Sequence, residues 1–212
     1  MTGAGEHGTR ERILAVAETF LGDFGYHGTR LHQIAQQVGI QKASLFHYFA
    51  SKADLYHAVI EEGFGETEQT VRRVLEAPTA PLVKACALVE AYVDMVAAHP
   101  ARTKIFLRQS FGDAPAGFER ALDLQRLLSL VVGFIADGQA ARAFAPVDPL
   151  ALVLSIIGMV AFFFTSAPVV VPGFAEPGSA SVARIKQHAV TVVQRCLTDG
   201  EPPKLAAAEA AA

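Results

Sequence analysis

The sequence is poor in the residues that zinc sites, disulfide frameworks and most enzyme active sites need. It has two cysteines among 212 residues, and it contains no CxxC motif or Cys/His cluster. Cys86 and Cys196 both lie in apolar helical patterns, so we expect buried, reduced thiols and a cytoplasmic protein. We find no nucleophile–base pair and no glycine-rich phosphate loop. The sequence therefore predicts no catalytic site, no metal site and no cofactor.

Basic residues are also too few for a nucleic-acid-binding surface that covers the whole chain. The formal net charge is -3 and the pI is about 6.2. The balance differs locally, because five Lys/Arg face three Asp/Glu between Arg10 and Lys52, which gives that segment a charge of +2. A dimer would double this positive patch. The charge pattern allows a nucleic-acid-binding segment near the N-terminus.

One long stretch lacks charge altogether. Residues 150–171 are 22 residues without Asp, Glu, Lys or Arg. Pro168 is expected to end a helix near Ala167, which leaves about 18 residues, the lower limit for a membrane span. No basic cluster flanks the stretch, and the first eight residues lack the apolar run of a signal peptide. We therefore expect a helix at a subunit interface, with a membrane helix as the alternative.

Residues 29–52 have the pattern of two short helices joined by a tight turn. We expect Thr29 to be the N-cap of the first helix, which runs to about Gln37, and Gly39 to supply the bend. An apolar stripe faces inward from this helix, formed by Leu31, Ile34, Ala35 and Val38. This is the arrangement of a helix-turn-helix, whose second helix enters the major groove of DNA.

The start of the second helix carries side chains that suit base edges. Gln41 can pair with adenine and Lys42 can donate to guanine O6 and N7, while Ala43 and Ser44 allow close approach. Ser51 and Asp54 resemble a capping box at the start of the next helix. Lys52, in the first turn of that helix, is placed to bind a phosphate.

From Arg10 to about Leu55 the chain resembles the DNA-binding domain of the tetracycline-repressor (TetR) family of bacterial transcription regulators. The matching residues are Ile13, Ala17, Phe20, Gly25, Tyr26, Thr29, Ile34, Ala35, Val38, Gly39, Ile40, Lys42, Leu45, His47, Tyr48, Phe49, Lys52 and Leu55. The resemblance implies a dimeric, all-α repressor with a variable C-terminal domain that binds a small molecule. Arg30, Gln41 and Phe46 depart from the family pattern. Phe46 replaces a tyrosine that often contacts phosphate, and the Arg30 guanidinium is expected to restore such a contact.

Together these arguments predict an all-α protein of about nine helices that binds an operator duplex. The predicted DNA-contacting residues are Thr29, Arg30, Gln41, Lys42, Ala43, Ser44, His47, Tyr48 and Lys52. We expect Gln41 and Lys42 to recognise bases, and Thr29, Tyr48 and Lys52 to hold the DNA backbone. The predicted domains are a disordered N-terminus at residues 1–9, a helix-turn-helix domain at 10–55, an effector-binding and dimerisation domain at 56–198, and a flexible tail at 199–212.

The C-terminal domain is expected to hold a small apolar effector and to form a homodimer. Prolines and apolar spacing predict helices at 82–98, 101–111, 118–141, 149–167 and 179–197, the last two forming the dimer interface. Ile185, Ala189, Val192, Val193 and Cys196 give the last helix an apolar stripe. The candidate effector contacts are aromatic or flexible apolar residues, and the competing interpretation is that they are core: Tyr92, Met95, Phe106, Phe111, Phe134, Phe162 and Phe163.

Two other functions remain open from the sequence. One is a membrane-associated or effector-independent DNA-binding protein, and the other is an enzyme with a helical pocket. Fractionation with membranes would favour the first, and turnover of a substrate would favour the second. Salt-dependent binding to a palindromic duplex would favour the transcription regulator.

Overall fold

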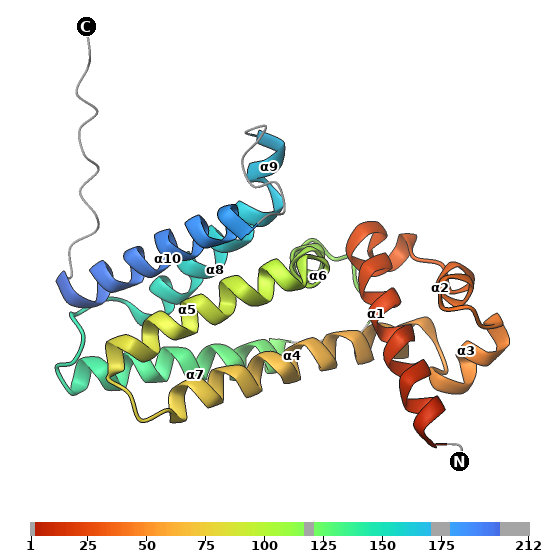
Figure 1. The fold of residues 1–212 in the computed structure, drawn as a ribbon, viewed down its shortest axis with the longest axis horizontal. Coiled ribbons are helices and arrows are strands. Elements are labelled where there is room, and N and C mark those ends of the chain that lie inside the picture. The colour runs from red at the N-terminus through yellow and green to blue at the C-terminus, as the bar shows by residue number, and fades with distance from the viewer. Residues whose placement is uncertain (1–2, 117–120, 171–178, 200–212) are drawn as a thin grey trace, which may run out of the picture. The chain divides into compact units, whose positions relative to one another are not determined.

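The computed structural model describes residues 3–116, 121–170 and 179–199, and these residues form ten helices and no strand (Figure 1). The all-α prediction is therefore confirmed. The helices are α1 (Gly3–Gly28), α2 (Leu31–Val38), α3 (Lys42–Tyr48), α4 (Lys52–Glu76), α5 (Pro81–Ala98), α6 (Pro100–Ser110), α7 (Ala121–Ala140), α8 (Pro149–Thr165), α9 (Ala167–Val170) and α10 (Ser179–Asp199).

The chain divides into two compact units. Unit 1 comprises residues 1–69 and 98–124, and unit 2 comprises residues 70–97 and 125–212. The predicted domain boundary after residue 55 does not coincide with this division. The reason is that α6 packs along α1 and therefore belongs to unit 1, although it follows α5 of unit 2 in the sequence.

Helix α1 is longer than the sequence suggested. It begins at Gly3, whereas the predicted helix-turn-helix domain begins at residue 10. No proline occurs before Pro78 to prevent this extension. Gly25 has φ 72°, which breaks the helical geometry within α1.

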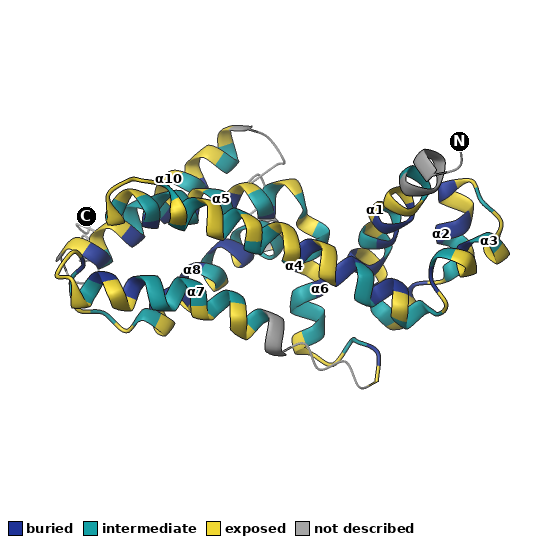
Figure 2. Cartoon of the chain, turned by 90° about the horizontal axis from the view of Figure 1, so that it is seen from below, coloured by how far each residue is buried: buried dark blue, intermediate teal, exposed yellow. Residues whose placement is uncertain are grey.

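Unit 1 is built around a core shared by α1, α2, α3, α4 and α6. Buried positions lie on the inward faces of these helices and exposed positions on the outward faces (Figure 2). The predicted stripe of α2 is confirmed for Ile34, Ala35 and Val38, whose relative exposures are 2% or less, while Leu31 packs at the edge. The buried members of this core are Ile13, Leu14, Ala17, Leu21, Ile34, Ala35, Val38, Leu45, Phe49, Leu55, Tyr56, Val59, Ile60 and Ile105.

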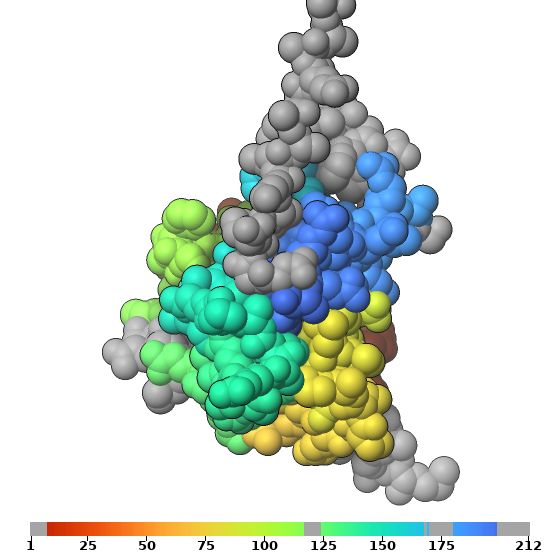
Figure 3. All heavy atoms as spheres, turned by 90° about the vertical axis from the view of Figure 1, so that its left-hand side faces the viewer, coloured from red at the N-terminus to blue at the C-terminus, as the bar shows by residue number. Residues whose placement is uncertain are grey.

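Unit 2 has an apolar core formed by α5, α7, α8 and α10. Asp148 caps α8 by accepting a hydrogen bond from the Ala151 N–H at 3.0 Å, as its position before Pro149 predicts. At one end of the unit, the Ala145 N–H donates to the Leu197 carbonyl at 2.7 Å. Figure 3 shows this end, with the last turns of α10 in blue against the α7–α8 connection in teal.

Helices α8 and α10 differ from their predictions in two respects. Helix α8 ends at Thr165, two residues before the predicted end at Ala167, and Pro168 lies in the first turn of the short α9, where the missing N–H of proline costs no helical hydrogen bond. Ile185, Ala189 and Val193 are 4% exposed or less because they pack into the core of their own unit. The prediction that these three side chains face a partner subunit is therefore wrong.

Some sequence predictions cannot be compared with the structure. The start of the predicted helix at 118–141, residues 171–178 and the predicted tail from residue 200 lie outside the described residues. Among the described helices, none combines the length and the apolar character that a membrane span requires.

Candidate nucleic-acid interface

The turn between α2 and α3 is fixed by backbone hydrogen bonds. Gly39 adopts a left-handed conformation, with φ 82° and ψ 32°, and its N–H donates to the Ala35 and Gln36 carbonyls. The Ile40 N–H donates to the same Ala35 carbonyl at 3.0 Å. These bonds satisfy carbonyls that the end of α2 would otherwise leave without partners. The turn predicted at Gly39 is thereby confirmed.

Two arginines of α1 support this turn and α3. The Arg12 guanidinium donates to the Val38 carbonyl, the last carbonyl of α2. The Arg10 guanidinium carbon lies 5.5 Å from the centroid of the Phe49 ring, which is buried at the end of α3. Such a cation over an aromatic face is attracted by the ring's quadrupole. Two of the basic residues that give the segment its positive charge are thus engaged in positioning α2 and α3.

Helix α3 has one buried and one exposed face. Leu45 is completely buried and Phe49 is 5% exposed, so these side chains anchor the helix on the core. Gln41 is the N-cap residue but its side chain makes no capping hydrogen bond, which leaves the amide free to bind another group. The exposed residues share the opposite face, and they are Gln41, Lys42, Ala43, Phe46 and His47.

This exposed face includes most of the predicted DNA-contacting residues on α3. Ser44 and Tyr48 lie at its margins and are half-buried. The Lys42 ammonium lies 5.9 Å from the centroid of the Phe46 ring, one helical turn further along. The structure therefore presents amide, ammonium and imidazole groups together on the side of α3 that faces away from the core.

Thr29 does not cap α2. The N-cap of α2 is Arg30, whose side chain is exposed and makes no capping hydrogen bond. The Thr29 hydroxyl is buried and lies within donating distance of the Gly25 carbonyl at 2.6 Å and the Phe20 carbonyl at 3.0 Å. The hydroxyl thus satisfies the end of α1, and the N-cap prediction is wrong. The Thr29 side chain is only 2% exposed, so it is buried beneath the surface rather than part of it.

Lys52 is half-buried at the start of α4. Its ammonium donates to the His27 carbonyl at 3.4 Å and lies 4.7 Å from the centroid of the Tyr26 ring. Burial lowers the pKa of Lys52, while the negative charge of Asp113 acts in the opposite direction. The preceding Ser51 caps the helix, since its hydroxyl accepts from the Asp54 N–H at 3.1 Å and donates to the Asp54 carboxylate at 2.9 Å. The predicted capping role of Ser51 is confirmed.

Helix α6 fastens the C-terminal half of α1 through basic side chains. Arg108 donates to the Gly22 and Asp23 carbonyls at 3.2 and 2.9 Å, and the Lys104 ammonium lies 2.7 Å from the Asp23 carboxylate. A side chain on Gly22 would place its Cβ 2.8 Å from the Ala101 backbone, so glycine permits the close approach of the two helices. These contacts fix the helix that carries Arg10 and Arg12.

Asp113, which follows α6, holds the kink in α1. Its carboxylate accepts from the His27 N–H at 3.2 Å and pairs with Arg108 at 3.8 Å. A Cβ on Gly25 would lie 1.8 Å from the Asp113 carboxylate oxygen. Gly25 is therefore required twice, by its positive φ and by this close contact.

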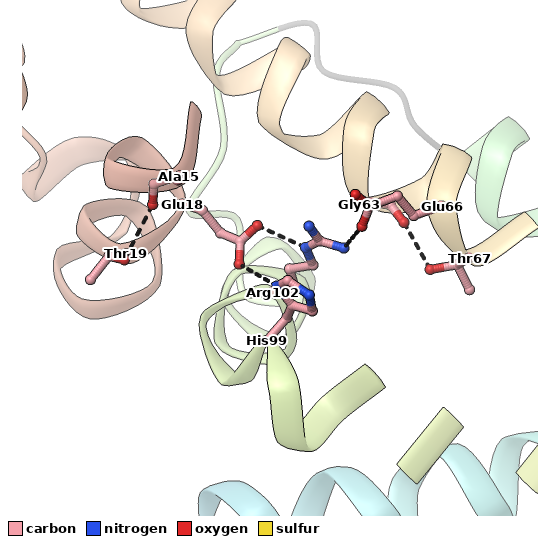
Figure 4. Close-up of polar contacts among 8 residues, drawn as sticks. All are labelled: Ala15, Glu18, Thr19, Gly63, Glu66, Thr67, His99 and Arg102. Carbon is pink, nitrogen blue, oxygen red and sulfur yellow. Dashed lines mark hydrogen bonds and ion pairs between the residues drawn. The ribbon is translucent and has the colours of Figure 1, made fainter. Parts of the chain in front are cut away.

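Arg102 joins three helices of unit 1 (Figure 4). Its Nε donates to Glu18 of α1 at 2.7 Å, and its Nη1 pairs with Glu66 of α4. His99 also contacts Glu18, with its Nδ1 3.4 Å from the carboxylate. A Cβ on Gly63 would lie 3.2 Å from Arg102 Cδ, so a larger residue would crowd the guanidinium stem.

Sequence reasoning missed the contributions of Arg102, Lys104, Arg108 and Asp113. These residues lie more than 80 positions from their partners in α1, so no local pattern reveals the pairing. The available signal was the glycines at positions 22 and 25 of a helical segment, because glycine within a helix is costly unless another group approaches closely.

The predicted effector residues fall in both units. Phe106 and Phe111 belong to unit 1, and Phe111 is 88% exposed. Phe162 is 54% exposed on α8, and a side chain that open does not line an enclosed pocket within its own chain. The remaining predicted residues are partly buried against the core of unit 2, and they are Tyr92, Met95, Phe134 and Phe163.

Two of these residues have specific contacts inside unit 2. The Tyr92 hydroxyl donates to the Ile157 carbonyl at 3.3 Å, and burial raises the pKa of Tyr92 to about 12. Phe163 lines an open groove of about 500 Å³ together with residues of α10. The polar lining of that groove includes Arg184 and His188.

Comparison with known proteins identifies this architecture. The sequence model of "Bacterial regulatory proteins, tetR family" matches residues 13–59, which comprise most of α1 together with α2, α3 and the start of α4. The HTH-type transcriptional regulator RutR of Escherichia coli (strain K12) is 27% identical over 203 residues, which cover 92% of this chain and 91% of RutR. Residues 13–59 therefore resemble the tetR family, and the chain as a whole resembles a transcriptional regulator. We conclude that it is a helix-turn-helix transcriptional regulator.

Solved structures of other regulators share the fold. The structure of the ketosteroid transcriptional regulator KstR2 of Mycobacterium tuberculosis has a TM-score of 0.73 at 19% identity, with 89% of this chain and 94% of that chain covered. AibR, solved in complex with isovaleryl coenzyme A and operator DNA, has a TM-score of 0.69 at 21% identity, with 86% and 96% covered. The similarity to both structures therefore extends well beyond the helix-turn-helix.

Proposed function

We propose that this regulator is a repressor that binds a palindromic operator as a homodimer and releases it when a small apolar effector binds. The observation that carries the proposal is the exposed face of α3, where Gln41, Lys42 and His47 stand free above the buried anchor Leu45. A recognition helix needs such a face of hydrogen-bonding groups to distinguish base pairs in the major groove.

The roles of individual residues follow from their exposure. Gln41 and Lys42 recognise bases, because their side chains begin the helix and point away from the core. Arg30 binds a phosphate with its exposed guanidinium. Tyr48 and Lys52 hold the DNA backbone from the margin of the face, and the buried Thr29 positions the end of α1 beneath it.

The homodimer forms through an exposed, uncharged face of α8. Its residues recur at spacings of three and four, and they are Leu150, Ala151, Leu154, Ser155, Gly158 and Phe162. Leu150, Leu154 and Phe162 are each about half exposed within one chain. An apolar helix face of this kind is normally covered by a partner, and a twofold axis lets the same face cover itself.

The effector binds within the apolar interior of unit 2. Apolar surface comes from Tyr92, Met95, Phe134 and Phe163, and the Tyr92 hydroxyl adds a polar contact to the Ile157 carbonyl. The names of similar proteins support a ligand with an apolar part, since one is a ketosteroid regulator and another is complexed with isovaleryl coenzyme A, whose acyl group is apolar although the coenzyme is charged. Operator binding places the protein in the cytoplasm, and neither catalysis nor a membrane partner is part of the proposal.

Selection from a pool of random duplexes tests the DNA-binding proposal. The full-length protein should enrich a palindrome whose half-sites are about 10 base pairs apart. Its affinity for that duplex should fall steeply with salt, because each neutralised phosphate releases a counterion. Light scattering should give twice the mass of the chain. Failure to enrich any sequence, or binding that is insensitive to salt, would contradict the proposal.

Reciprocity tests the effector. A ligand that weakens operator binding must itself bind more weakly to the operator complex by the same factor, about 5–150-fold for typical couplings. Phe134→Ala should reduce this response while leaving operator affinity in the absence of ligand unchanged. A screen of apolar compounds measures operator affinity with and without each compound. If no compound changes the operator affinity, the result would favour an effector-independent regulator.

A further inference from the structure

Phe46 is the large apolar side chain on the exposed face of α3. It is 43% exposed and lies outside the hydrophobic core of unit 1, in contrast to its neighbours Leu45 and Phe49. Tyr48, the other aromatic residue within α3, packs against that core. Phe46 thus contributes little to holding α3 in place, and its ring is available to another molecule.

Lys42 and Phe46 form a mixed polar and apolar pair. They are four residues apart on one helix face, and the Lys42 ammonium lies 5.9 Å from the centroid of the Phe46 ring. At 1.5 Å per residue the two Cα atoms are about 6 Å apart along the helix axis. Since adjacent base pairs are about 3.4 Å apart, the ring reaches a base pair one or two steps from the one that Lys42 contacts.

The chemistry of the ring limits what it can recognise. A phenylalanine has no donor for a phosphate oxygen, and its apolar surface gains little next to the polar edges of guanine, adenine or cytosine. The C5-methyl group of thymine is the apolar feature of the major groove. The proximity of the Lys42 ammonium adds a donor for guanine O6 and N7 beside this apolar surface.

We propose that Phe46 determines operator specificity by packing against a thymine methyl group one or two base pairs from the guanine that Lys42 contacts. This inference rests on the proposed function, because it assumes that α3 enters the major groove. It adds recognition of the thymine methyl group by Phe46, which the polar groups of α3 cannot provide.

Single replacement of thymine by deoxyuridine tests the contact. The operator is first selected with the full-length protein, and each thymine in one half-site is then replaced in turn, which removes only the methyl group. Fluorescence anisotropy should show about a fourfold loss of affinity at one position, the loss expected from one buried methyl group. That position should lie within two base pairs of the guanine at which Lys42→Ala relaxes the preference.

Variants of Phe46 identify the side chain responsible. Phe46→Ala should bind the thymine and deoxyuridine duplexes equally well, so that the fourfold difference disappears. Phe46→Leu, which keeps an apolar side chain, should retain most of that difference. Phe111→Ala is the matched control, because Phe111 is also an exposed phenylalanine of unit 1 but follows α6, and it should leave the difference at fourfold.

The possible results separate this inference from the proposed function. If the protein binds a specific operator but no deoxyuridine replacement matters, or if the difference persists in Phe46→Ala, the thymine contact is wrong and the proposed function stands. If no duplex is enriched, both are wrong. Phe46→Ala could also lose the same factor of affinity for the thymine and the deoxyuridine duplexes, so that the ratio of the two affinities is unchanged. That result would place the ring against the sugar–phosphate backbone and overturn the inference.

Discussion

The two units of this regulator hold their helices together by different means. In unit 1, Arg102, Lys104 and Arg108 of α6 each bind a carboxylate or a carbonyl of another segment, and glycines let backbones and side chains approach closely. In unit 2, the core formed by α5, α7, α8 and α10 is almost entirely aliphatic and aromatic. Its described polar contacts between helices include Lys186–Asp94 and Tyr92–Ile157.

This difference suits the tasks proposed for the two units. Hydrogen bonds and ion pairs depend on direction as well as distance, so they fix α1 and α6 in one arrangement. Apolar contacts depend mainly on the area removed from water, and a core made of them can be repacked at modest cost. Recognition of bases requires helices held in one fixed arrangement, and accommodation of an effector requires a core that can be repacked.

The largest expected effect is the loss of stability when a charge is placed in the core of unit 2. A charge on the proposed dimer surface of the same unit should instead change only the oligomeric state. Val193→Glu places a carboxylate where the native side chain is 4% exposed, and we expect a loss of more than about 4 kcal/mol in the free energy of unfolding. Leu154→Glu, on the exposed face of α8, should leave the helical content intact and yield a monomer. Circular dichroism and light scattering measure the two outcomes. A folded dimer of Leu154→Glu would show that this face is not the interface.

The close approach at Gly25 should be the most sensitive point of unit 1. Gly25→Ala combines a positive φ with a Cβ 1.8 Å from the Asp113 carboxylate, and should cost about 3 kcal/mol of unfolding free energy. Gly39→Ala is the comparison, because Gly39 lies in the left-handed helical region, with φ 82° and ψ 32°, and has no atom within 4 Å of the added Cβ. It should cost about 1 kcal/mol. Urea unfolding that gave equal costs would contradict the role of Asp113.

The ion pairs of α6 should contribute differently to the free energy of unfolding, according to how far they are buried. Arg102→Ala leaves Glu18, whose side chain is 15% exposed, without its guanidinium, and should cost about 2 kcal/mol of unfolding free energy. Lys104→Ala breaks a pair in which both side chains are nearly half exposed, and should cost less than about 0.5 kcal/mol. Denaturant titrations of both variants make the comparison. Equal costs would mean that Arg102 does not join the helices as described.

The fold was predictable where the sequence pattern depended on a single helix. Spacing of apolar residues located α2, and the sequence Asp148-Pro149 located the start of α8 together with its cap. The division into units was not predictable, because α6 returns to α1 across a long separation in sequence. The apolar stripe of α10 was assigned to a partner, but Ile185 and Val193 are buried within their own unit. Periodicity shows that a face is apolar, without showing what covers it.

The candidate site was predictable in outline. The order of residues around Gly39 indicated the helix-turn-helix and the exposed start of α3, with Gln41 and Lys42. The sequence could not show that the hydroxyl of Thr29 turns back to the end of α1. It also gave no sign that the ammonium of Lys52 is shared with a carbonyl and an aromatic ring, since both contacts depend on tertiary packing.

The central claim is that α3 recognises bases while the start of α4 holds the backbone. The most direct test compares Lys42→Ala and Lys52→Ala on the selected operator and on variants of it at each position. Lys42→Ala should lose about 1–3 kcal/mol of binding free energy and relax the preference at one base pair in each half-site. Lys52→Ala should weaken binding to all duplexes alike and lower the salt slope by about one per bound phosphate. An unchanged base preference in Lys42→Ala would contradict the account.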